Sequence, residues 1–124
     1  MLDKINYLET EDERYPMVFS LNVMESIQEK YGSIEKWTEL IQSEGEPNIK
    51  ALKFFMTEAI NEGIDIENEK TGEKSKPITL KKVGRILTEI GLSETANKII
   101  KTVSESVQTG EQAKNMETTE NQTE

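Results

Sequence analysis

The sequence predicts an α+β fold that is mostly α: a small N-terminal β-hairpin packed on about five short helices, followed by a disordered acidic C-terminal tail. Two short segments before residue 20 have the two-residue apolar period of β-strands. Between residues 20 and 107 the period changes to about 3.6 residues, which is typical of amphipathic helices. Residues 108–124 contain a methionine as their only large apolar side chain. We therefore expect one domain over residues 1–107 and a disordered tail over residues 108–124.

The predicted hairpin consists of residues 5–8 and 15–19, separated by a polar segment. Tyr15, Met17 and Phe19 share one face of the second strand, because successive side chains in a strand point to opposite faces. The proline in this strand indicates an edge position, because proline cannot donate a hydrogen bond to a ladder. Two strands alone are marginally stable in water, so we expect this ribbon to lie on helices.

Five segments have the helical period, and each is bounded by residues that begin or end helices. The predicted boundaries are Ser20 to Gly32, Ser33 to the breaker cluster 43–47, Asn48 to Gly63, Thr79 to Gly91, and Ser93 to about Gln108. The side chains predicted to point inward are Leu21, Met24, Ile27 or Gln28, and Tyr31; Ile34, Trp37, Leu40 and Ile41; Ile49, Leu52, Phe55, Met56, Ala59 and Ile60; Leu80, Val83, Leu87 and Ile90; and Ala96, Ile99 or Ile100, Val103 and Val107.

The segment between Asp65 and Pro77 is almost wholly polar. A segment of this composition cannot bury enough apolar surface to order itself. We therefore expect an exposed loop that connects the third and fourth predicted helices.

The composition excludes most enzyme chemistry. The 124 residues include neither Cys nor His, which removes thiolate nucleophiles, histidine bases and zinc sites of the Cys/His kind. Two carboxylate pairs, Glu25 with Glu29 and Glu35 with Glu39, have helical i, i+4 spacing. Both pairs lie on polar faces beside lysines, as expected of a hydrated surface. We expect a protein that is not an enzyme and that uses no metal and no cofactor.

Hydropathy argues against a membrane protein. The longest apolar stretch is a few residues, whereas a spanning helix needs roughly 20. Residues 1–10 lack the basic start and apolar middle of a signal peptide. The expected location is the cytoplasm, and no membrane partner is expected.

Charge is divided unevenly along the chain. Residues 1–73 carry 7 basic and 17 acidic side chains, residues 74–101 carry 7 and 2, and residues 102–124 carry 1 and 5. The basic block coincides with the fourth and fifth predicted helices. We expect it to be a docking face for an acidic segment, in this chain or another. The candidate basic residues are Lys81, Lys82, Arg85, Lys98 and Lys101.

An alternative interpretation of the same block is a helix-turn-helix DNA-binding regulator. The short turn 91–93 would place Lys98 and Lys101 on a recognition helix. Against this, the turn alignment puts Leu87 where the motif prefers a small residue and Asn97 where it needs an apolar one. The acidic flanks would also repel DNA, whose affinity comes from basic side chains. The sequence therefore favours a protein without a nucleic-acid partner.

One run resembles a known family. Residues 15–33, Tyr-Pro-Met-Val-Phe-Ser-Leu-Asn-Val-Met-Glu-Ser-Ile-Gln-Glu-Lys-Tyr-Gly-Ser, resemble the N-terminal signature of phage tail assembly chaperones from long-tailed phages and prophages of Gram-positive bacteria. That signature is an aromatic-Pro strand, then Phe-x-Leu-Asn, then a helix ending in an aromatic-Gly-Ser step. Residues 51–59 resemble the family's middle helix, and residues 80–87 resemble its Leu-x-x-Val-Gly-x-Leu segment. The resemblance covers roughly residues 4–107.

The resemblance implies a non-enzymatic protein of the host bacterial cytoplasm that binds the tape measure protein, keeps it soluble during tail assembly and is absent from the mature virion. The tail tube protein is a second candidate partner, and self-association or a structural tail or connector role are alternatives. Small domains use most of their aromatic residues internally, so the core is the alternative location for each apolar candidate. The apolar candidates for the partner surface are Tyr15, Met17, Phe19, Trp37 and Phe54.

Overall fold

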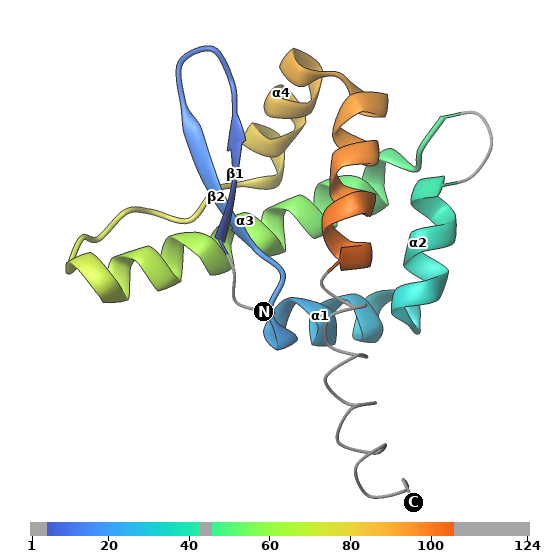
Figure 1. Cartoon of the computed structure of the whole chain (residues 1–124), viewed down its shortest axis with the longest axis horizontal. Helices are drawn as coiled ribbons and strands as arrows, with labels where there is room; N and C mark the ends of the chain where they lie inside the picture. Colours follow the sequence, from blue (N-terminus) through green and yellow to red (C-terminus); the bar gives the residue numbers. More distant parts are fainter. Residues whose placement is uncertain (1–4, 43–45, 106–124) are drawn as a thin grey trace, which may run out of the picture.

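The computed structural model describes residues 5–42 and 46–105, which form an antiparallel hairpin followed by five helices (Figure 1). This confirms the predicted fold class. The predicted breaker residues 43–45 and the predicted tail 108–124 lie outside the described residues. The elements are β1 (Ile5–Glu9), β2 (Arg14–Val18), α1 (Leu21–Tyr31), α2 (Ile34–Gln42), α3 (Ile49–Thr71), α4 (Leu80–Ile90) and a fifth helix over residues 92–105.

The predicted hairpin is present, its strand ends differ by one residue from the prediction so that Phe19 follows β2, and its register runs from Ile5 opposite Val18 to Glu9 opposite Arg14. Pro16 lies opposite Tyr7. Among the described residues the sheet consists of these two strands, so Pro16 occupies an edge strand as predicted. As expected of a ribbon this small, one face lies against a helix, since β2 packs along α3.

The long helix α3 organises the fold. It contacts β2, α1, α2 and α4, and Figure 1 shows it running across the molecule. The prediction that this helix ends at Gly63 is wrong, because the helix continues to Thr71 and ends at Gly72. Gly72 adopts a left-handed φ of +80°, and its N–H donates to the Asn68 carbonyl oxygen at 2.8 Å.

Gly63 has a packing role instead. A Cβ built on Gly63 would lie 2.7 Å from the carbonyl oxygen of Pro16, so only glycine allows β2 to approach α3 this closely. Beyond this crossing, the Tyr7 hydroxyl of β1 donates to Glu67 at 2.7 Å. The extra turns of α3 are therefore fixed by the hairpin, which sequence periodicity alone does not reveal.

The connection between α3 and α4 is exposed, as predicted, but it begins later and is ordered by two asparagine side chains of α3. The Asn68 amide donates to the Ser75 carbonyl oxygen at 3.0 Å and accepts from the Ser75 N–H at 3.1 Å. Earlier in α3, the Asn61 side chain makes the same pair of hydrogen bonds with the backbone of Ile78, at 3.3 and 2.7 Å. The connection thus runs back along α3 although it buries little apolar surface.

Four of the five predicted helix starts are confirmed as caps, whereas the prediction that Ser93 opens the fifth helix is wrong, because that helix begins at Leu92. The side chains of Ser20, Ser33, Asn48 and Thr79 each accept a hydrogen bond from a backbone N–H three residues later, at 3.3, 3.0, 2.9 and 3.1 Å. Gly32 and Gly91 end α1 and α4 as predicted, and both have positive φ angles.

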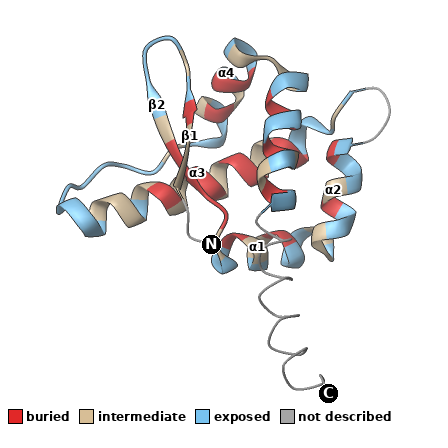
Figure 2. Ribbon diagram, viewed as in Figure 1, coloured by how far each residue is buried: buried red, intermediate tan, exposed pale blue. Residues whose placement is uncertain are grey.

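The core lies between α3 and the elements around it, as the buried segments in Figure 2 show. Leu21, Leu40, Ile49 and Leu80 were predicted to point inward, but they are 66%, 36%, 52% and 52% exposed. Leu21 and Leu80 are the first residues of their helices, where no preceding turn exists for the side chain to cover. The core residues are Leu8, Met17, Val18, Phe19, Val23, Ile27, Trp37, Ile41, Ala51, Leu52, Phe55, Met56, Ala59, Ile60, Val83, Ile86, Leu87, Ala96, Ile99 and Val103.

Candidate partner-binding surface

Three of the five apolar candidates belong to the core. Met17 and Phe19 are each 3% exposed and Trp37 is fully buried, so none of them forms part of the molecular surface. The ring of Trp37 lies 4.9 Å from that of Phe55, and Phe55 lies 5.6 Å from Phe19. These three residues therefore belong to the core, which was the alternative location for the apolar candidates. A partner-binding surface has to consist of other residues.

Tyr15 lies at the edge of the hairpin and is half-buried. Its hydroxyl donates to the Glu13 carboxylate, which lies 3.5 Å from the Lys82 ammonium of α4. Burial, followed by the hydrogen bond to Glu13, raises the pKa of Tyr15 to about 12. The hydrogen bond from Tyr15, followed by the charge of Lys82, lowers the pKa of Glu13. Tyr15 thus helps to hold the hairpin against α4 through Glu13.

We expect the stability of the folded chain to fall between pH 10 and about pH 12. The pKa of Tyr15 is raised from 10.0 in the folded state, so the stabilisation from this group is complete below pH 10 and is lost as the pH rises through about 12. Urea unfolding of the native chain and of Tyr15→Phe at pH 9 to 12 measures the effect. The variant should lose less stability over this interval, and parallel curves for the two proteins would contradict the assignment.

Phe54 is half-buried on the side of α3 that faces α1. The Tyr31 ring meets it edge-on at 5.8 Å, and the Lys30 ammonium lies 4.8 Å from its ring centre. These contacts come from the last turn of α1 and cover part of the ring. Phe54 therefore contributes a limited edge of apolar surface.

Some side chains of the basic block make contacts within the chain. Lys82 pairs with Glu13 of the hairpin, and the Lys98 ammonium donates to the Tyr7 carbonyl oxygen at 3.5 Å. Two members of the block thus dock on the hairpin, whose turn is rich in acidic residues. In contrast, Lys81, Arg85 and Lys101 are exposed and form no hydrogen bond or ion pair within the described residues.

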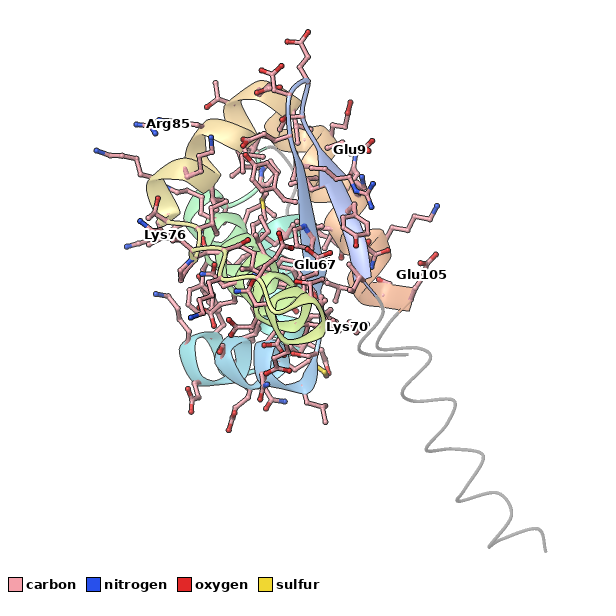
Figure 3. All side chains as sticks on the ribbon, turned by 90° about the vertical axis from the view of Figure 1, so that its left-hand side faces the viewer. Glu9, Glu67, Lys70, Lys76, Arg85 and Glu105 are labelled. Atoms are coloured by element: carbon pink, nitrogen blue, oxygen red, sulfur yellow. The ribbon has the colours of Figure 1, made fainter. Side chains whose placement is uncertain are left out.

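The charged side chains are only partly separated in space. Figure 3 shows Arg85 and Lys76 on one side of the molecule and Glu9 and Glu105 on the opposite side. The exposed face of the fifth helix carries alternating signs, because Glu94 and Glu105 stand four residues from Lys98 and Lys101 respectively. Such a face suits DNA poorly, since phosphates attract an unbroken set of basic side chains. The free basic surface is therefore that of α4.

An open groove lies between the first turns of α3 and the second half of α4. Its volume is about 290 Å³. Ile49, which is 52% exposed, stands at its rim, and the nearly buried Leu87 lies at its base. We call it the α3–α4 groove. Its lining residues are Ile49, Lys53, Gly84, Leu87, Thr88, Gly91 and Leu92.

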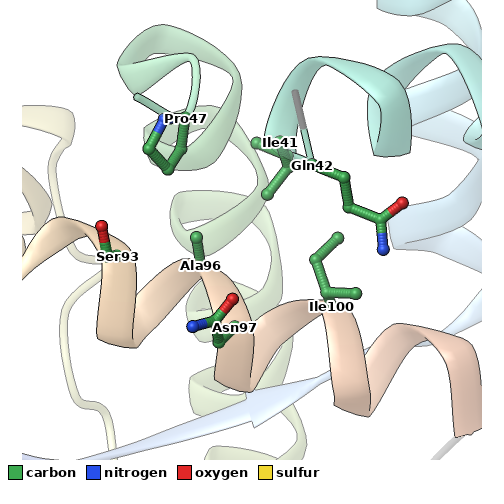
Figure 4. A pocket seen from close by; sticks show the side chains of 7 residues that line it. All are labelled: Ile41, Gln42, Pro47, Ser93, Ala96, Asn97 and Ile100. Atoms are coloured by element: carbon green, nitrogen blue, oxygen red, sulfur yellow. The ribbon is translucent and has the colours of Figure 1, made fainter. Parts of the chain in front are cut away.

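A second pocket, of about 400 Å³, lies between the end of α2 and the fifth helix (Figure 4). The figure shows Gln42 reaching from α2 toward Ile100. Three of its seven lining side chains carry amide or hydroxyl groups, so it is less apolar than the α3–α4 groove. The lining residues are Ile41, Gln42, Pro47, Ser93, Ala96, Asn97 and Ile100.

Within residues 5–42 and 46–105, no three acidic side chains gather in a way that could hold a metal ion. The same described ranges contain no helix that is both long and apolar enough to span a membrane.

Comparisons with protein-family models, with curated proteins and with solved structures found no match to this chain. The site thus has to be judged from its own residues. Ile49 was expected to point inward, and nothing in the sequence indicated that Gly84 and Leu92 line a groove. A usable signal was present for Ile49, because an apolar side chain at the first position of a helix is poorly covered, as Leu21 and Leu80 also show.

Proposed function

We propose that this chain is a non-enzymatic phage tail assembly chaperone that binds the tape measure protein and keeps it soluble until the tail is built. The run 15–33 carries the proposal, because it resembles the family signature over a continuous stretch. Each part of the signature coincides with a structural unit: the aromatic-Pro segment is β2, Ser20 caps α1, and Gly32 ends it with a φ of +94°. The proposed setting is the host cytoplasm, and the protein is not retained in the mature virion.

The surface suits a protein that shields a partner. A tape measure protein is long and helical with apolar stretches, so its chaperone needs exposed apolar positions on a highly charged, soluble body. This chain carries a net charge of −9 and exposes Leu21, Ile49 and Leu80 by half or more. The α3–α4 groove and the second pocket, which lies between α2 and the fifth helix, add concave surface.

Co-expression tests the proposal directly. The tape measure gene of the same phage or prophage is expressed alone, with this chain, and with an unrelated acidic protein of similar size. We expect the soluble fraction of the tape measure protein to rise severalfold only with this chain, and a tag on this chain to recover both proteins. An unchanged soluble fraction together with no co-purification would contradict the proposal.

Two other functions predict different results. A DNA-binding regulator would retard a duplex in a gel, with an affinity that falls steeply with salt and depends on Lys98 and Lys101. The mixed charges of the fifth helix and the engagement of Lys98 with the hairpin weigh against it. A structural tail or connector component would be found in purified particles, whereas a chaperone would be present only in the assembling cell.

A further inference from the structure

We propose that the α3–α4 groove binds an acidic amphipathic helix, with the apolar stripe of that helix in the groove and its carboxylates on the basic rim. The inference rests on the proposed function only in naming the tape measure protein as the source of this helix. The groove and its charges define the chemistry of the partner independently of that name.

The lining of the groove is mainly apolar or small. Ile49, Leu87 and Leu92 supply the aliphatic surface, Gly91 leaves room at the end of α4, and the Lys53 side chain lies over Gly84. A Cβ built on Gly91 would meet no atom within 4 Å. The hydroxyl of Thr88 donates to the Gly84 carbonyl oxygen at 2.9 Å, so its polar group is satisfied within α4. A partner therefore has to bring apolar side chains rather than hydrogen-bonding groups to this lining.

The dimensions favour a helix over a small molecule. The volume of about 290 Å³ lies just below the usual range of small-molecule pockets, and the groove is open to solvent. Gly84 to Gly91 span roughly 10 Å along α4 at 1.5 Å per residue. This length matches about two turns of a partner helix, which presents apolar side chains at i, i+3, i+4 and i+7.

The rim of the groove is basic. Lys53 lies in the groove itself, and its ammonium group is 3.5 Å from the position of a Cβ built on Gly84. Lys50 lies one turn before it on α3, while Lys81 and Arg85 flank Gly84 on α4. No acidic residue occurs between residues 47 and 57, and the only acidic residue of α4, Glu89, accepts a hydrogen bond from the Glu11 N–H of the hairpin at 2.8 Å.

This local charge is opposite in sign to that of the whole molecule. The chain has a net charge of −9, so most of its surface repels an acidic partner while the rim of the groove attracts it. Complementary charge of this kind orients a partner and rejects basic competitors. The occupant is therefore a helix whose apolar stripe is bordered by Glu and Asp. A second copy of this acidic chain is less suited, because its remaining surface would be repelled.

Designed peptides test the groove without any knowledge of the client. One probe is a helical peptide of about 20 residues, long enough to be partly helical alone, with a leucine stripe flanked by glutamates. The second probe has the same leucines flanked by lysines. We expect the glutamate peptide to bind the full chain at least about tenfold more tightly by fluorescence anisotropy, with an affinity that weakens as salt screens the rim. Amide shifts in NMR spectra should centre on Ile49, Gly84 and Leu92.

Charge reversal supplies the matched control. Lys53→Glu combined with Arg85→Glu should weaken the glutamate peptide by about tenfold and strengthen the lysine peptide. Lys101→Glu, a single charge reversal on the fifth helix, should leave both affinities within about twofold. Equal binding of the two peptides, or amide shifts centred on Gln42 and Asn97 of the other pocket, would overturn the proposal. A change of oligomeric state in the double variant would place a second copy in the groove and would also overturn it.

The same variants separate this inference from the proposed function. If the tape measure protein co-purifies equally with the native chain and with Lys53→Glu/Arg85→Glu, the groove is not its binding site while the chaperone function stands. If the glutamate peptide binds as described but the tape measure protein does not co-purify, the groove is a site for acidic helices and the chaperone function fails. Circular dichroism of the double variant confirms that it is folded in either case.

Discussion

Replacing Gly63 by alanine should lower the free energy of unfolding by about 2 kcal/mol, even though alanine favours a helix over glycine by about 1 kcal/mol. The added Cβ would lie 2.7 Å from the Pro16 carbonyl oxygen and 2.8 Å from the Pro16 carbonyl carbon. Both are backbone atoms of β2, so relief requires the strand to move away from α3. Overpacking of this kind typically costs about 1–3 kcal/mol, and more where the neighbour cannot yield. Urea unfolding followed by circular dichroism measures the change.

Gly84→Ala is the matched control, because it makes the same substitution inside another helix. The new Cβ would lie 3.5 Å from the end of the flexible Lys53 side chain, which is an ordinary contact. We expect Gly84→Ala to raise the free energy of unfolding by about 0.5–1 kcal/mol through helix propensity. An increase in the free energy of unfolding for Gly63→Ala, like the one expected for Gly84→Ala, would mean that α3 and β2 are not as close as described.

Local sequence signals determined most of the fold. The caps at Ser20, Asn48 and Thr79 could be predicted because a side-chain oxygen before an apolar periodic segment satisfies free N–H groups of the first turn. The hairpin could be predicted because its two strands have the right period and flank a polar turn. These features depend on residues that are close together in the sequence, so a single sequence is enough to predict them.

The errors arose where distant residues decide the structure. Gly63 resembles a helix end in sequence, yet it marks the crossing of β2 over α3. The polar residues after it are helical because Tyr7 binds Glu67 and Gly72 provides the actual end. The connection that follows is held by Asn61, whose side chain binds a backbone 17 residues away. None of these long-range contacts alters the apolar period of the sequence, so the period does not predict them.

The candidate surface was predictable only in part. The basic block was visible from residue counts, but its division into members bound to the hairpin and members left exposed, such as Arg85, depends on the tertiary structure. The aromatic candidates could not be assigned to core or surface by type alone, and Met17, Phe19 and Trp37 proved to be buried. The α3–α4 groove joins residues about 40 positions apart in sequence, as Ile49 and Leu92 illustrate.

Replacing Trp37 by alanine should cost about 3–5 kcal/mol of the free energy of unfolding, which is the range for removal of a large buried aromatic side chain. Trp37 is fully buried, its ring lies 4.9 Å from that of Phe55, and its indole N–H donates to the Ala51 carbonyl oxygen at 3.1 Å. A domain of this size has a total stability of about 5–15 kcal/mol, so the variant should unfold at much lower urea concentration. Circular dichroism is the appropriate probe, because Trp37 is the only tryptophan.

Trp37→Phe separates the packing of the ring from its hydrogen bond. It keeps an aromatic ring against Phe55 but removes the donor to Ala51, so we expect a smaller loss of about 1–2 kcal/mol. In the native chain, buried Trp37 should also resist quenching by acrylamide. A partner-binding role for Trp37 predicts the opposite pattern: ready quenching, little change in stability for Trp37→Ala, and loss of the co-purified client. The same measurements therefore decide whether Trp37 belongs to the core or to a partner-binding surface.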